Sequence, residues 1–182
     1  MSLLLEAKEL ALVRGGRLLF EKLDLALGQG EALHITGPNG SGKSSLIRLV
    51  AGMLRPSAGW VERSPAALAD EGLALDRELG LGRALAFWRG PRLGEAMAAF
   101  DLDRLAAVPV RLLSTGQAKR ARLARAMASG APLWLLDEPL NGLDHDGRER
   151  LAAAVAAHRS TGGAVVAASH GAFDGEWREL AL

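Results

Sequence analysis

The sequence predicts an α/β fold: a mainly parallel sheet with an antiparallel β part before it and a helical segment inserted into it. Three observations predict this class. Two apolar segments joined by a glycine turn open the chain, a strand then leads through a glycine-rich loop into a helix, and later strands alternate with helices. Such alternation is typical of parallel sheets, because the chain must cross over between parallel strands.

The N-terminal part predicts a hairpin followed by a strand and a helix. Apolar segments at Leu3–Val13 and Leu18–Leu27 flank the turn signal Arg14-Gly15-Gly16-Arg17. The next apolar segment, Glu31–Thr36, is typical of a buried strand, and Lys43–Ala51 has the pattern of a helix. The glycine-rich loop lies between them.

The middle of the chain differs in composition. Residues 64–109 are rich in Ala and Leu and predict short helices at Leu79–Trp88 and Gly94–Ala107, without a strand. We place a helical segment roughly at 64–128, inserted in a single domain that spans 1–182.

The second half predicts alternating elements. A helix is expected at Thr115–Ala128, a strand at Leu133–Leu136, a helix at Asp146–His158 and a strand at Ala164–Ser169. These elements complete the parallel sheet of the predicted core.

Composition excludes several classes of function. The formal net charge is +1, which argues against a protein whose main role is non-specific binding of nucleic acid. The chain has no Cys, so disulfide frameworks and cysteine nucleophiles are excluded. No apolar run approaches the ~20 residues that span a bilayer, and the first residues lack the basic part of a secretory signal. We therefore expect a cytosolic chain without a membrane span.

Two further features are open to more than one interpretation. The basic run Lys119–Arg125 is interpreted as a helix with solvated or ion-paired arginines, and not as a nucleic-acid patch. The apolar residues Leu85, Phe87 and Trp88 fit either a docking patch for a membrane subunit or core packing.

The strongest chemical signal is a loop that fits the pattern G-x-x-x-x-G-K-[ST] between a strand and a helix. Glycines let successive main-chain N–H groups point at phosphate oxygens, and the helix presents its positive end. Lys43 would reach the β- and γ-phosphates of a nucleotide, and the Ser44 hydroxyl would bind Mg²⁺. The predicted phosphate-binding residues are Gly37, Pro38, Asn39, Gly40, Ser41, Gly42, Lys43, Ser44 and Ser45.

A pair of acids follows the strand Leu133–Leu136. Ligands of open α/β sheets bind at the carboxyl ends of the strands, where Asp137 and Glu138 are expected. Asp137 would hold Mg²⁺, generally through water, and Glu138 would accept a proton from the water that attacks the γ-phosphate. Solvated acids that merely end a strand are the alternative, which the nearby phosphate loop disfavours.

A third motif decides the class. In isolation, Ser114 or Thr115 would simply cap the helix that they open. Together with the phosphate loop and the acid pair, however, Leu113–Gln117 resembles the signature motif of ABC ATPases. Leu140–Asp144 likewise resembles the D-loop of that family, and His170 after a strand resembles its switch histidine. The chain is identified as a member of the ABC ATP-binding cassettes, which have a RecA-like core of the P-loop NTPase type.

The resemblance implies an ATP-hydrolysing enzyme that works in pairs. ATP would be held head to tail between the phosphate loop of one copy and the signature helix of the other. Ser114 and Gly116, in one segment with Thr115 and Gln117, would contact the γ-phosphate bound by the partner. His170 would act with Glu138 and sense loss of the γ-phosphate, and Asp144 would help to couple the two sites.

A narrower resemblance is to the CcmA family, the ATP-binding subunits of cytochrome c maturation complexes. The segments Arg14–Phe20, Ala131–Pro139 and His158–Gly163 carry it. It implies haem export or release of a haem-loaded chaperone, at the cytoplasmic face of the inner membrane, with the integral membrane subunits CcmB, CcmC and CcmD. The alternatives are another small-substrate ABC transporter, a soluble ABC ATPase, or a small-molecule kinase that uses the same loop.

The chain departs from the ABC pattern at three places. Arg14 occupies the place of the aromatic residue that stacks on adenine, and we expect its guanidinium plane to stack instead. The glutamine that links Mg²⁺ to the membrane subunits is missing, and Asp70 or Glu71 lies in that neighbourhood. Thr115 replaces the first signature glycine, where its β-branch would crowd the phosphate.

Overall fold

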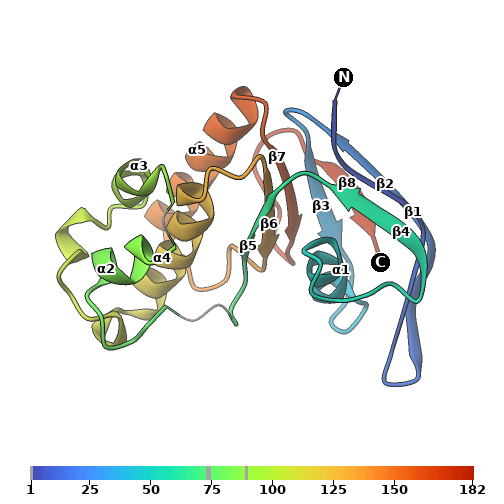
Figure 1. Ribbon diagram of the computed structural model, residues 1–182, viewed down its shortest axis with the longest axis horizontal. Helices are drawn as coiled ribbons and strands as arrows, with labels where there is room; N and C mark the ends of the chain where they lie inside the picture. Colours follow the sequence, from blue (N-terminus) through green and yellow to red (C-terminus); the bar gives the residue numbers. More distant parts are fainter. Residues whose placement is uncertain (1, 73–74, 89) are drawn as a thin grey trace.

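The computed structural model describes residues 2–72, 75–88 and 90–182 (Figure 1). Its centre is a parallel sheet with the strand order β5-β6-β7-β3-β8. The strands are β3 (Ala32–Thr36), β5 (Ala66–Ala69), β6 (Leu133–Asp137), β7 (Ala164–Ala168) and β8 (Arg178–Ala181). The predicted parallel sheet is therefore confirmed.

A second, antiparallel sheet has the order β2-β1-β4. It consists of β1 (Leu3–Arg14), β2 (Arg17–Gly28) and β4 (Ala58–Arg63). The first two strands form the predicted hairpin. Gly15 and Gly16 in its turn have φ values of 56° and 75°, a left-handed conformation that glycine adopts at little cost.

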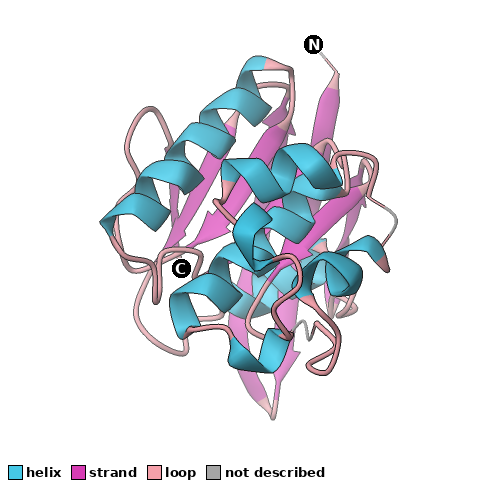
Figure 2. Cartoon of the chain, turned by 90° about the vertical axis from the view of Figure 1, so that its left-hand side faces the viewer, coloured by secondary structure: helices cyan, strands magenta, loops and turns pink. Residues whose placement is uncertain are grey.

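The helices lie on both faces of the parallel sheet. They are α1 (Lys43–Val50), α2 (Leu81–Ala86), α3 (Leu93–Ala99), α4 (Thr115–Ala128) and α5 (His145–Ser160), with short 3₁₀ helices at Asp103–Leu105 and Val110–Leu112. Helix α1 lies between the two sheets, and the other helices cover the opposite face of the parallel sheet (Figures 1 and 2). Within the described ranges, no helix combines the length and the apolar character that a bilayer crossing requires.

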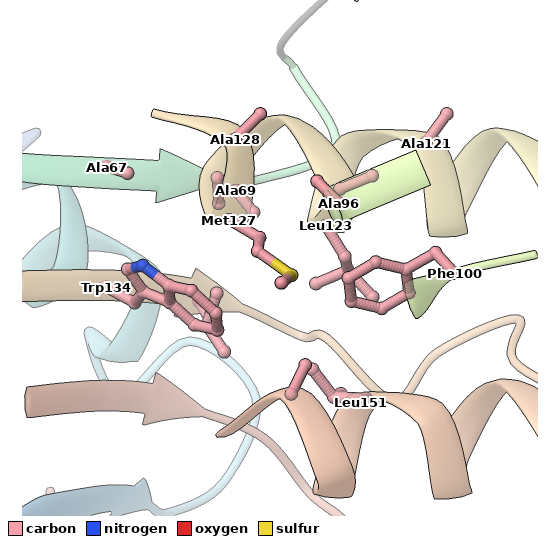
Figure 3. Packing of buried hydrophobic residues seen from close by; sticks show 14 of the residues in the cluster. Ala67, Ala69, Ala96, Phe100, Ala121, Leu123, Met127, Ala128, Trp134 and Leu151 are labelled. Carbon is pink, nitrogen blue, oxygen red and sulfur yellow. The ribbon is translucent and has the colours of Figure 1, made fainter. Parts of the chain in front are cut away.

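The hydrophobic core has two halves because side chains alternate along a strand. Leu133 and Leu135 of β6 pack in the cluster that includes α1 and the antiparallel sheet. Trp134 and Leu136 pack on the other side, with α3, α4 and α5, where Figure 3 shows Trp134 near Met127. Strand β6 is thus buried on both faces, which fixes the position of the acids that follow it.

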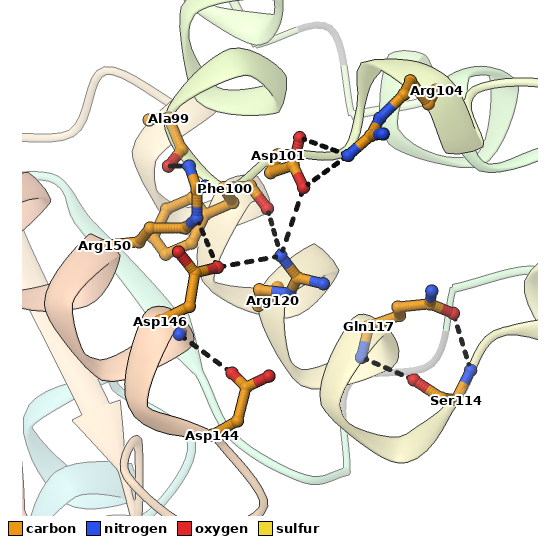
Figure 4. A network of polar contacts seen from close by, with 11 residues as sticks. Ala99, Phe100, Asp101, Arg104, Ser114, Gln117, Arg120, Asp144, Asp146 and Arg150 are labelled. Carbon is orange, nitrogen blue, oxygen red and sulfur yellow. Dashed lines mark hydrogen bonds and ion pairs between the residues drawn. The ribbon is translucent and has the colours of Figure 1, made fainter.

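A polar network ties three helical elements together at the surface (Figure 4). Arg120 of α4 donates to the carbonyl oxygen of Phe100 at 3.2 Å and lies 3.9 Å from Asp101 Oδ2 and 3.8 Å from Asp146 Oδ2. Arg150 of α5 donates to the same Asp146 oxygen at 2.7 Å. The network holds the start of α5 against the middle of α4.

The structure corrects the prediction for residues 64–109. This segment contains β5, a strand of the parallel sheet, so the expectation of no strand there is wrong. Its sequence is nearly all alanine, which has a low preference for strands. The predicted helix Gly94–Ala107 ends at Ala99, and Asp101 has a φ of 51°, which interrupts the helical path.

His158 near the end of α5 makes the fold sensitive to acid. Its ring stacks on Trp134 at a centroid distance of 4.0 Å, and burial lowers the pKa of His158 below its ordinary value of 6.5. Since the folded state disfavours the protonated ring, stability is lost as the pH falls below 6.5, by up to about 1.4 kcal/mol per pH unit.

We therefore predict that His158→Phe, which keeps an aromatic ring, loses less stability than the wild type between pH 8 and pH 5.5. Urea unfolding of both proteins at the two pH values measures this difference. The change in the free energy of unfolding between the two pH values is taken for each protein separately. Any cost of packing the phenyl ring does not depend on pH and therefore cancels. An equal loss in both proteins would contradict the role given to His158.

Candidate active site

The glycine-rich loop connects β3 to α1 and has a backbone that only glycine adopts readily. Gly37 and Gly42 have φ values of 139° and 117°. A Cβ atom on Gly37 would lie 2.5 Å from the carbonyl oxygen of Leu182, so a side chain has no room there. These conformations shape the loop into a turn around the first residue of α1, as the motif predicts.

Lys43 folds back over the loop. Its Nζ donates to the carbonyl oxygens of Gly37 at 2.7 Å and Pro38 at 3.1 Å, and lies 3.4 Å from His170 Nε2. The residue is 6% exposed. Its positive charge is therefore held by neutral main-chain oxygens at the mouth of the loop, where an anionic phosphate would be a stronger partner.

Ser44 and Asp137 join the loop to the end of β6. Ser44 Oγ donates to Asp137 Oδ1 at 2.8 Å, and Arg48 Nη2 lies 3.9 Å from Asp137 Oδ2. Burial raises the pKa of the Asp137 carboxyl, and the Ser44 hydrogen bond and the Arg48 charge oppose this shift. A hydroxyl and a carboxylate at this distance are oxygen donors of the kind that fit Mg²⁺.

Glu138 is held in an unusual backbone conformation next to His170. Its φ is 46°, and Lys119 Nζ donates to its carbonyl oxygen at 2.7 Å. Glu138 Oε1 lies 3.6 Å from His170 Nε2, which in turn is 2.7 Å from Asn39 Oδ1. Glu138 Oε2 is buried and has no hydrogen-bond partner in the described part of the chain, so its capacity to accept a hydrogen bond is unused.

These groups surround a cleft of about 730 Å³, a size typical of ligand pockets. It is lined by Arg14, Gly15, Leu19, Asn39, Gly40, Gly42, Lys43, Ser44, Ser45, Glu138, Asn141 and His170. The predicted loop, the second acid and the histidine therefore meet in one place. The described lining includes no Phe, Trp or Tyr side chain, and Arg14 Nη1 donates to Ser45 Oγ at 3.4 Å.

The predicted residues at the starts of α4 and α5 do not line this cleft. Ser114 and Gln117 form a capping box, in which Ser114 Oγ accepts from Gln117 N at 3.2 Å and Ser114 N donates to Gln117 Oε1 at 2.9 Å (Figure 4). Asp144 caps α5 by accepting from Gly147 N at 2.9 Å. Ser114, Thr115 and Asp144 are exposed.

Sequence reasoning missed three residues of the site. Asn141 lines the cleft, Arg48 approaches Asp137, and Lys119 is buried beneath Glu138. Arg48 follows Ser44 by about one helical turn, a spacing that would have identified it as a neighbour. The basic run is interpreted from the sequence as a helix with solvated or ion-paired arginines; Lys119 at its start is instead buried, and burial lowers the pKa of its ammonium group.

The arrangement is a glycine-rich loop with a carboxylate and a histidine on the other side of one cleft. Two comparisons define its class. The family model described as ABC transporter matches residues 20–141. The solved ATP-binding subunit of an ABC transporter superposes with a TM-score of 0.82 at 24% identity, covering 92% of this chain and 79% of that one. The chain therefore belongs to the ABC transporter family, as an ATP-binding cassette.

Two relatives narrow this placement. The cytochrome c biogenesis ATP-binding export protein CcmA of Sphingopyxis alaskensis is 55% identical over 93% of this chain and 91% of its own. The protein of the same name from Novosphingobium aromaticivorans is 60% identical over 91% and 88%. Within the ABC family, the chain belongs to the CcmA group and is an ABC-type ATPase. The predicted fold class and family are confirmed.

We predict that Lys43→Ala weakens ATP binding and hydrolysis together, because the removed ammonium serves both the ground state and the transition state. Titration with a fluorescent ATP analogue should show a dissociation constant raised at least about tenfold, or roughly 1.4 kcal/mol. Thermal unfolding without nucleotide serves as the control for folding. Unchanged affinity in a folded Lys43→Ala protein would contradict the assignment of the loop.

Proposed function

We propose that the chain is the ATP-binding and ATP-hydrolysing subunit of a membrane ABC complex for c-type cytochrome biogenesis. The observation that carries this proposal is the cleft that unites Lys43, Glu138 and His170 in a chain up to 60% identical to proteins named CcmA. ATP hydrolysis would drive conformational change in membrane subunits that serve haem export or release of a haem-loaded chaperone.

The triphosphate would lie along the glycine-rich loop. Main-chain N–H groups of the loop and the start of α1 face its oxygens, and Lys43 moves from the carbonyl oxygens of Gly37 and Pro38 to the β- and γ-phosphates. Arg14, at the end of β1, lies at the nucleoside end of the cleft. A guanidinium there stacks on any base, which weakens the preference for adenine.

Ser44 and Asp137 would hold Mg²⁺, because both supply oxygen ligands. Ser44 Oγ and Asp137 Oδ1 are already 2.8 Å apart. When bound, the ion supplies positive charge to the phosphate oxygens. The Ser44 hydroxyl would offer an oxygen lone pair to the cation while its O–H still donates to Asp137 Oδ1, and Asp137 would hold the ion through water.

Glu138 would act as the general base. Its carboxylate, which lines the cleft, would accept a hydrogen bond from a water and take the proton as the water oxygen attacks the γ-phosphorus. The bond between the γ-phosphorus and the β–γ bridging oxygen breaks in the same step. His170, fixed by Asn39 at 2.7 Å, faces the same point and would contact the γ-phosphate. ADP and inorganic phosphate leave.

The 114–117 segment supports a head-to-tail pair. Ser114 and Thr115 are exposed at the positive end of α4, outside the cleft of their own chain. We propose that Ser114, Thr115, Gly116 and Gln117 close the cleft of a second copy over the γ-phosphate, with Asp144 at the same face. A Cβ atom placed on Gly116 would lie 3.3 Å from the carbonyl oxygen of Gly142, so the 114–117 segment lies close to the segment that contains Asp144.

Membrane partners complete the proposal. We propose that the chain is a single domain with its helical segment inserted in the core, bound peripherally at the cytoplasmic face of the inner membrane by CcmB, CcmC and CcmD. Leu85 belongs to the core, whereas Phe87 is 76% exposed and is available for contact with a partner. Core packing is therefore the interpretation that applies to Leu85, and docking to a membrane subunit is the one that we propose for Phe87.

We predict that Glu138→Gln binds ATP with Mg²⁺ but hydrolyses it at least about 100-fold more slowly, because an amide cannot accept the proton. The trapped ATP should hold two copies together. Sedimentation with ATP, and with ADP as the control, should show a dimer in ATP only. Normal phosphate release by Glu138→Gln would remove Glu138 as the base, and phosphate found on an added metabolite would indicate a kinase.

The biological assignment is tested by capture of tagged Glu138→Gln from detergent-solubilised native membranes with ATP, followed by mass spectrometry. Lys43→Ala is the matched control, since it lacks the trapped nucleotide. Recovery of CcmB, CcmC and CcmD with Glu138→Gln is the expected result. Membrane proteins of another pathway would overturn the cytochrome c assignment, and only non-membrane partners would overturn the transporter assignment.

A further inference from the structure

A second layer of charged groups lies behind the proposed metal site. Arg48 of α1 is located between two buried carboxylates: its Nε is 3.7 Å from Asp70 Oδ2, and its Nη2 is 3.9 Å from Asp137 Oδ2. The Asp70 side chain is 5% exposed and that of Asp137 is 9% exposed. One guanidinium therefore serves two carboxylates that have little access to water.

Sheet register brings the two acids together. Ala69 of β5 pairs with Leu136 of β6 in parallel, and an aspartate is the next residue after each. Both carboxylates thus emerge at the same edge of the sheet, side by side. At this edge α1 supplies Ser44 and, about one turn later, Arg48 from the same face of the helix.

The two oxygens of Asp137 have different partners. Oδ1 accepts from Ser44 and faces the phosphate loop, while Oδ2 faces Arg48. A carboxylate held at both oxygens has a fixed orientation, which is what a metal ligand requires. Asp70 does not line the cleft, so it reaches the site through Arg48 and not by direct contact with the nucleotide.

We propose that Arg48 and Asp70 are positioning residues of the metal site. Asp70 attracts the guanidinium of Arg48 and so keeps it at about the same distance from both carboxylates. At that distance Arg48 orients Asp137 without displacing the cation. This inference rests on the magnesium site of the proposed function. Without Arg48, its screening of the repulsion between the two buried carboxylates is lost, and Asp137 turns away from the orientation that the cation needs. Without the Asp70 charge, Arg48 closes on Asp137 and competes with the cation.

This account predicts an unusual pattern of variants. Arg48→Gln and Asp70→Asn should each raise the Mg²⁺ concentration needed for half-maximal tightening of ATP binding by at least about fivefold, or roughly 1 kcal/mol. The double variant should lie closer to the wild type than either single variant, because removing Asp70 also removes the repulsion that Arg48 had screened. Arg48→Lys keeps the positive charge, so this variant should retain most of the wild-type Mg²⁺ response.

The experiment is a titration of Mg²⁺ into the full chain with a fluorescent ATP analogue at pH 7, with binding in EDTA as the baseline. Arg63→Gln is the matched control, because Arg63 donates to the carbonyl oxygens of Val50 and Ala51 at the C-terminal end of α1 and has no contact with Asp137 in the described part of the chain. It should lower the unfolding temperature without moving the Mg²⁺ midpoint. A purely structural role for Arg48 would likewise lower stability and weaken binding equally with Mg²⁺ and with EDTA.

Two results would overturn the proposal while leaving the magnesium site in place. One is an unchanged or lowered Mg²⁺ midpoint in folded Asp70→Asn and Arg48→Gln proteins. The other is additivity of the two single changes in the double variant. A wild type whose ATP binding does not respond to Mg²⁺ would overturn both the magnesium site and the positioning role, so the two failures are distinguishable.

Discussion

The parallel pairing of β3, β7 and β6 is the constraint on which the rest of the site depends. Because these strands run in one direction, the chain leaves the sheet at one edge after each of them. The glycine-rich loop, the pair Asp137-Glu138 and His170 follow those three strands. The 2.8 Å hydrogen bond from Ser44 to Asp137 then joins the loop to the acids across the width of the intervening strand.

The charges around the cleft are arranged so that they remain available to a substrate. Lys43 and Lys119, both buried, donate to main-chain oxygens and leave the carboxylate of Glu138 to the cleft. A buried ion pair between Lys43 and Glu138 would neutralise both groups and oppose phosphate binding. Arg48 differs from the two lysines, since its guanidinium lies 3.9 Å from a carboxylate oxygen, Asp137 Oδ2.

Local signals explain what the sequence could predict. The loop, the hairpin and α4 depend on residues close together in the chain, such as the capping pair Ser114 and Gln117, and each was located from its pattern. The strand β5 was missed because three of its four residues are alanine, which has little preference for strands. The contact of Arg48 with Asp70 was not predictable, since it depends on the register of β5 with β6.

The central claim is that one cleft holds the triphosphate between the loop and Glu138 and that a second copy closes it. A crystal structure of Glu138→Gln with ATP and Mg²⁺ tests this claim most directly. The γ-phosphate is expected beside Lys43 and His170, with Ser114 of a second copy facing it. A triphosphate bound elsewhere, or a γ-phosphate open to solvent with the 114–117 segment far from any nucleotide, would contradict it.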